Sequence, residues 1–190
     1  MTPAQNALIK ADIAANADMN TLPANSDGSY AIADLYNLPA VPQYNVWRTN
    51  ASVQAINDAI DVTKYTPADV PAIGDAPAQA ALFLNRAALI NIKQMNLQNM
   101  LVGRETIDAS RATVRAGLRD AVIGVPAGTS GVSTAPGGAS GVNVMNACTR
   151  PATRLEKLLV TSTPATGGVT AGVMGFEGSV SYQQIDAARV

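Results

Sequence analysis

The sequence has no histidine, and Cys148 is its only cysteine. An intrachain disulfide is therefore impossible, and zinc sites of the Cys/His type are excluded. The side chain that most often acts as a general base near neutral pH is also missing. Cys148 lacks a histidine partner that could activate it, so we expect an inert residue that is at least half buried. We predict no enzymatic activity, no catalytic residue, no metal and no cofactor.

Charge and large apolar side chains are both scarce. Charged residues make up 14% of the chain, against roughly 25% in a typical soluble protein. Hydrophobic residues reach 47%, but 34 of them are alanines, which bury little area, and aromatic residues are only 4%. We expect a modest core whose stability depends partly on neighbouring subunits. A weakly charged monomer is the alternative.

Nothing in the chain indicates a membrane protein or a strongly basic nucleic-acid binder. No run of about 18 apolar residues is long enough to cross a bilayer. The first residues lack the basic stretch and apolar run of a secretory signal. The net charge is −1, which offers no electrostatic footprint for nucleic acid at the level of the whole chain.

Local signals predict several helices, a loop and a hairpin. Thr2–Gln5 has the spacing of a capping box with proline at the first helical position, and Ser181–Gln184 repeats it before a short final helix to about Arg189. Six glycines between positions 124 and 141 indicate a flexible loop. Leu155–Thr161 and Gly172–Val180 are predicted to pair as a hairpin.

The longest predicted helix runs from about Ala76 to Val102, roughly 40 Å, with Gly103 as a stop signal. Steps of 100° per residue divide its apolar side chains between two opposite faces, with amides between them. We therefore predict a mainly α fold, a helical bundle built on one long central helix, with extended arms and a small C-terminal β-hairpin. We expect one structural domain over residues 1–190, with an extended segment 38–49, the glycine-rich loop 124–141 and a hairpin and tail at 150–190.

One face of this helix is the predicted oligomer interface. It carries Leu84, Ala88, Ile92, Met95 and Val102, and the interface assignment comprises Leu84, Ile92, Met95, Asn96 and Asn99. In a chain with so small a core, an apolar second face is expected to meet another copy. A central helix enclosed within one domain is the alternative.

A proline-rich arm precedes this helix. Pro39 and Pro42 favour extended geometry in their neighbours, and the arm carries Val41, Tyr44, Val46 and Trp47. Such large apolar side chains must be buried, either in the protein's own domain or in a groove of a neighbour. The second case makes these four residues a docking segment for a partner.

Four arginines recur at helical spacing in the following region. If the region is helical throughout, Arg104, Arg111, Arg115 and Arg119 lie along one line. Such a line is usually a solvated face or a set of salt bridges. One alternative is that the arginines contact acidic groups of a partner ring or packaged DNA. A further alternative is that the whole protein is a small DNA-binding module.

Three aspartates are the only residues that would support the alternative prediction of an enzyme. Asp58 and Asp61 are three residues apart, and Asp108 lies among the arginines. Paired carboxylates can perform acid–base chemistry, but no glycine-rich or metal-ligand context surrounds them. Helix-surface or capping roles are more common for such residues.

Three runs resemble a family of small structural proteins of tailed bacteriophages. They are Leu35–Thr49 (L-x-N-L-P-A-x-P-x-Y-x-V-W-R-T), Arg150–Leu158 (R-P-A-T-R-x-E-K-L) and Phe176–Arg189, which begins F-E-G-x-V-S. The glycine-rich loop departs from the family pattern in length and composition.

The resemblance implies a head–tail connector (adaptor) protein. Such a protein forms a ring of about twelve copies between the portal and the tail, assembled in the host cytoplasm and located at the head–tail junction of the virion. Packaged DNA passes nearby without sequence-specific binding. By the same analogy, Ala76–Val102 forms the ring, and Pro39–Trp47 or the C-terminal tail docks on the portal. A capsid decoration or minor head protein, or another neck or tail protein, is the alternative.

Overall fold

The computed structural model describes residues 1–60, 77–123 and 141–190. The predicted loop 124–141, apart from Gly141, and Asp61 lie outside the described residues. The chain divides into two compact units. Unit 1 comprises Met1–Trp47, Pro151–Pro164 and Ala171–Val190, and unit 2 comprises Arg48–Arg150 and Ala165–Thr170. That the chain forms one structural domain stays a prediction.

The fold class is mixed, and the predicted mainly α bundle is wrong. In the described part of the chain, nine helices account for 55% and several small antiparallel strand pairs for 15%. Most of the helices are short, because caps and turn residues end them after one to three turns. The extended segments between them satisfy their backbone groups by pairing as short strands. Among the described residues, no helix is long and apolar enough to cross a membrane.

Unit 1 is built mainly from short helices. Its elements are α1 (Pro3–Ala15), α2 (Ala17–Asn20), α3 (Ser26–Asn37), β1 (Asn45–Trp47), α8 (Arg154–Leu158), β5 (Val160–Ser162), β8 (Val173–Met174) and α9 (Tyr182–Arg189). Strands β5 and β8 are antiparallel. The predicted hairpin has shorter strands than expected, because the helix α8 occupies most of the segment that was predicted as its first strand. Helices α1 and α3 both pack against α9.

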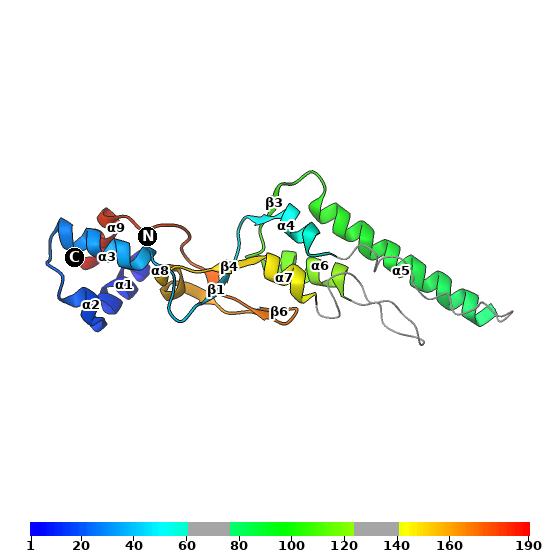
Figure 1. Ribbon diagram of the computed structural model, residues 1–190, viewed down its shortest axis with the longest axis horizontal. Helices are drawn as coiled ribbons and strands as arrows, with labels where there is room; N and C mark the ends of the chain where they lie inside the picture. Colours follow the sequence, from blue (N-terminus) through cyan, green and yellow to red (C-terminus); the bar gives the residue numbers. More distant parts are fainter. Residues whose placement is uncertain (61–76, 124–140) are drawn as a thin grey trace. The chain divides into compact units, whose positions relative to one another are not determined.

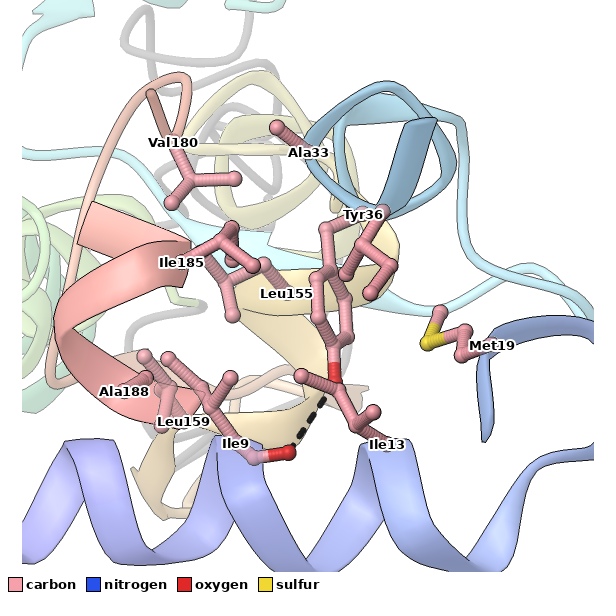
Figure 2. Packing of buried hydrophobic residues seen from close by; sticks show 11 residues of the cluster. Ile9, Ile13, Met19, Ala33, Tyr36, Leu155, Leu159, Val180, Ile185 and Ala188 are labelled. Atoms are coloured by element: carbon pink, nitrogen blue, oxygen red, sulfur yellow. Dashed lines mark hydrogen bonds between the residues drawn. The ribbon is translucent and has the colours of Figure 1, made fainter. Parts of the chain in front are cut away.

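The core of unit 1 contains a buried hydrogen-bonded tyrosine, Tyr36, which links two helices (Figure 2). Apolar side chains from five helices surround the ring of Tyr36, whose side chain is fully buried. Its single hydroxyl proton is shared between Asp12 Oδ2 at 2.8 Å and the more distant Ile9 carbonyl at 3.4 Å. Burial, with a smaller contribution from Asp12, raises the pKa of Tyr36. This hydrogen bonding holds α3 against α1 and does not leave the buried hydroxyl unpaired.

Both predicted capping boxes are confirmed. Thr2 and Gln5 exchange hydrogen bonds at the start of α1, and Ser181 and Gln184 do so at the start of α9. A third capping box, between Thr153 and Glu156, begins α8. These short-range bonds define where the helices start, because each satisfies amide groups that have no partner within the helix.

Unit 2 contains the longest helix of the described residues. Its elements are β2 (Ala51–Ser52), α4 (Val53–Asp58), α5 (Pro77–Leu101), β3 (Thr106–Ile107), α6 (Ala112–Val122), α7 (Val142–Ala147), β6 (Ala165–Thr166) and β7 (Val169–Thr170). The short strand β4 (Thr149–Pro151) spans the point where the two units divide. Strands β2 and β3 pair antiparallel, as do β6 and β7.

Helix α5 is one uninterrupted element (Figure 1). Its predicted extent is confirmed to within one residue, and Gly103 follows it with φ of +74°, a conformation that glycine adopts without strain. Helix α6 packs against α5. A Cβ atom added at Gly117 of α6 would lie 3.0 Å from Met100 Sδ of α5. Glycine therefore permits this close approach.

Candidate functional site

The exposed stripe of α5 is the first candidate interaction surface. Leu84 is 66% exposed, Ile92 49% and Met95 53%, and Asn96 and Asn99 are also exposed. At 100° per residue these five positions fall within about a third of the helix circumference, so they line one side of the helix. They are the predicted interface residues, and they are uncovered on the single chain. That they meet another copy stays a prediction.

The opposite side of α5 packs within unit 2. Ile90, Leu97 and Leu101 are each at most 6% exposed. Lys93 is anchored at the flank of the helix, where its ammonium donates to the Asp120 carbonyl and lies 3.7 Å from the Asp120 carboxylate. Ile90, Leu97 and Leu101 lie opposite Leu84, Ile92 and Met95 on α5, and among the described residues it is their side of the helix that is buried.

A small hollow lies at the C-terminal end of α5. It has a volume of about 150 Å³ and is lined by Val53, Asn57, Leu97, Gln98, Leu101 and Val102. The side chain of Val102 is 73% exposed beside it. An apolar hollow of this size can receive one or two apolar side chains.

A larger groove in unit 1 is the second candidate surface. It has a volume of about 700 Å³. Helices α1, α2, α3 and α8 and the segment after α3 contribute its lining: Asp12, Asn16, Asp18, Leu35, Leu38, Pro39, Ala40, Val41, Arg154, Lys157 and Leu158.

Backbone hydrogen bonds hold two of the motif segments together beside this groove. The Ala40 amide donates to the Ala152 carbonyl at 3.0 Å, and the Arg154 amide donates to the Leu38 carbonyl at 2.8 Å. Pro39 and Thr153 form an antiparallel bridge. The runs 35–49 and 150–158, more than a hundred residues apart in sequence, therefore form one surface. The sequence offered no signal for this pairing, because neither run carries a pattern that specifies its partner.

The four predicted docking residues differ in exposure. Val41 is 89% exposed and lines the groove, and Tyr44 is half buried. Val46 and Trp47 are 0% exposed, so the structure adopts the alternative in which the protein buries these two side chains itself. A docking role for Val41 and Tyr44 stays a prediction.

The four arginines do not form one helical line. Arg104 lies beyond the end of α5, and Arg111 occupies the extended position immediately before α6, where its side chain makes no capping hydrogen bond. Arg104, Arg111 and Arg119 are exposed, and a role for them in salt bridges or beside DNA stays a prediction.

Arg115 is 3% exposed and fastens the loop before α6. Its Nη1 donates to the carbonyls of Ala109 and Ser110, and its Nε donates to Thr166 Oγ1 at 3.4 Å. Burial lowers the pKa of Arg115, while Asp108 and Cys148 act to raise it. The guanidinium therefore links α6 to strand β6 inside unit 2.

Asp58 and Asp108, the two described residues of the acidic set that could support an enzyme, are separately engaged. Asp58 accepts a hydrogen bond from Gln54 Nε2 at 2.7 Å, and Asp108 accepts from the Ser110 amide at 3.0 Å. Both are local contacts of the helix-surface and turn type. Across residues 1–60, 77–123 and 141–190, no cluster of three or more His, Cys, Asp or Glu side chains could hold a metal ion.

Cys148 is buried, as predicted, with 0% exposure. Burial raises the pKa of its thiol from 9.0 to about 11, although Arg48 and Arg115 act to lower it. The thiol therefore remains protonated near neutral pH and is a poor nucleophile.

The raised pKa of Cys148 predicts a loss of stability at alkaline pH. Between pH 9 and pH 11 the unfolded chain releases the thiol proton while the folded chain retains it, so the free energy of unfolding falls as pH rises. The slope from this group approaches about 1.4 kcal/mol per pH unit. Urea unfolding of the wild type and Cys148→Ala at both ends of this window measures it, and parallel pH profiles of the two proteins would contradict the assignment.

Comparison of the chain with protein-family models, with curated proteins and with solved structures gave no match. The resemblance to phage structural proteins therefore rests on the three motif runs alone.

Proposed function

We propose that this protein is a non-enzymatic structural subunit of a tailed-phage virion, a head–tail connector that joins portal to tail as a homo-oligomeric ring around the DNA channel. The observation that carries the proposal is the exposed apolar stripe of α5. Leu84, Ile92 and Met95 leave large apolar areas in water, and covering such area is the main driving force for association.

The two ends of α5 differ in a way that suits a ring. Leu84 projects near one end, and the hollow beside Val102 lies at the other. A projecting side chain and a hollow at different places on one subunit favour head-to-tail contact, which closes into a ring when the rotation per subunit permits. The motif runs, which resemble those of adaptor proteins, support the same function.

Charge placed in the stripe is expected to prevent assembly. The double variant Leu84→Glu, Ile92→Glu would bury carboxylates at the interface, which is costly without partners. We expect the wild type to form concentration-dependent oligomers and the double variant to remain monomeric in analytical ultracentrifugation. Leu8→Glu is the matched control, because Leu8 is 50% exposed on α1 of unit 1; it should assemble like the wild type.

A wild-type protein that stays monomeric at all concentrations, both alone and with a portal protein, would remove the basis of the proposal. Counting copies in a particle by electron microscopy separates the remaining alternatives. About a dozen copies fits a connector, whereas hundreds fit a capsid decoration protein.

A further inference from the structure

The groove of unit 1 has two cationic side chains on one wall. Arg154 and Lys157 lie one turn apart on α8 and are both half buried. Arg154 stacks over the ring of Tyr36, 5.9 Å from its centroid. Among the described residues, neither head group has a carboxylate or carbonyl partner. Two cations thus face the groove with their hydrogen-bonding capacity available.

The acidic side chains of the groove do not neutralise this wall. Asp12 is already engaged, because its Oδ2 accepts from the Tyr36 hydroxyl at 2.8 Å and its Oδ1 accepts from Asn16 Nδ2 at 2.9 Å. Asp18 is exposed on α2, a different element of the lining. The groove therefore offers separate sites for a negative and a positive group.

Apolar side chains line the remainder of the groove. Leu38 is 55% exposed and Val41 89%, and Leu35 and Leu158 are partly buried beside them. Apolar area of this kind next to unpaired cations is typical of the centre and rim of a protein–protein interface. A nucleic-acid backbone would satisfy the cations, but it would leave the apolar area uncovered and would meet Asp18.

We propose that this groove binds an extended segment of a partner protein in which a carboxylate side chain stands between bulky apolar side chains. The carboxylate pairs with Arg154 and Lys157, for which a guanidinium provides paired donors. The apolar neighbours cover Leu38 and Val41. The inference deepens the proposed function, on which it rests, because it states the chemistry by which the subunit recognises a neighbouring protein of the assembly.

Two short synthetic peptides test the proposal with the full-length protein. Both alternate leucine with charged residues and differ only in carrying glutamate or lysine at the charged positions. Fluorescence anisotropy is expected to show the glutamate peptide binding at least about tenfold more tightly than the lysine peptide.

The variant Lys157→Glu is expected to reduce this preference by about tenfold or more, because it replaces an attractive charge with a repulsive one. Val41→Ser should weaken both peptides equally, since it removes apolar area and leaves the charges unchanged. Arg104→Glu, which makes the same charge change at an exposed site of unit 2, is the matched control and should bind like the wild type.

Equal binding of the two peptides, no binding of either, or a preference that Lys157→Glu leaves unchanged would overturn the proposal. So would tighter binding of a single-stranded oligonucleotide that competes with the glutamate peptide. The stripe variant Leu84→Glu, Ile92→Glu separates this result from the proposed function. It should bind the peptide normally even if it does not assemble, and a protein that assembles without binding the peptide would refute the groove alone.

Discussion

Replacing Glu156 with alanine is expected to lower the free energy of unfolding by about 3 kcal/mol. Glu156 is 1% exposed in α8 and connects two of the motif runs. Its Oε2 accepts from the Thr153 amide at 2.9 Å, and its Oε1 accepts from the Gly178 amide at 3.1 Å. One carboxylate therefore completes the capping box at the start of α8 and also binds the segment that leads to α9.

The size of the effect follows from what alanine leaves behind. Two amide groups lose a charged acceptor, and each such hydrogen bond is worth roughly 1.5–3 kcal/mol. Truncation also removes atoms of a side chain that is 1% exposed and so leaves a cavity. Glu156→Gln keeps one acceptor and nearly the same shape, so we expect a loss of only about 1–2 kcal/mol.

Urea unfolding followed by circular dichroism measures these differences. Asp34→Ala is the control, because Asp34 is an exposed carboxylate on α3 of the same unit, and we expect a change within about 0.5 kcal/mol. If Glu156→Ala were as stable as this control, the carboxylate would not be the link between α8 and the segment around Gly178.

Replacing Arg115 with alanine is expected to cost about 3 kcal/mol in unit 2. The guanidinium is buried and donates to two carbonyls of the loop before α6 and to Thr166 of β6. Alanine leaves those carbonyls without their donor. Arg115→Lys keeps the charge but has no planar fork to reach several acceptors, so we expect about half the loss.

Hydrogen exchange locates this effect better than a global unfolding curve. Amides of α6 and of the β6–β7 pair should lose protection in Arg115→Ala, while those of α1 and α9 in unit 1 should not. Arg104→Ala, at an exposed arginine, should match the wild type. Unchanged protection in α6 would mean that Arg115 does not fasten this region.

The start of each capped helix was predictable because its cause is local. Thr2 with Gln5, and Ser181 with Gln184, are three residues apart, so the sequence alone brings donor and acceptor within reach once the first turn forms. The third capping box, at Thr153 and Glu156, has the same spacing. It was missed because the apolar run after it also fits a strand.

The predicted alignment of Arg104, Arg111, Arg115 and Arg119 along one helix is wrong because it depends on contacts that are not local. The alignment requires a continuous helix, but Arg111 has extended backbone geometry and lies immediately before the first residue of α6. One of the hydrogen-bond partners of the buried Arg115 is Thr166, which is 51 residues away. Helical spacing contains no information about such a distant partner.

The sequence alone determined that no histidine and only one cysteine are present, where several helices start, and that α5 has two apolar faces, because these properties depend on composition or on residues within one or two turns. Only the tertiary structure decided which face of α5 the chain covers, that Val46 and Trp47 are buried, and that runs 35–49 and 150–158 meet at one groove. Those outcomes depend on contacts between distant segments, and many arrangements of short helices and strands satisfy the same local preferences.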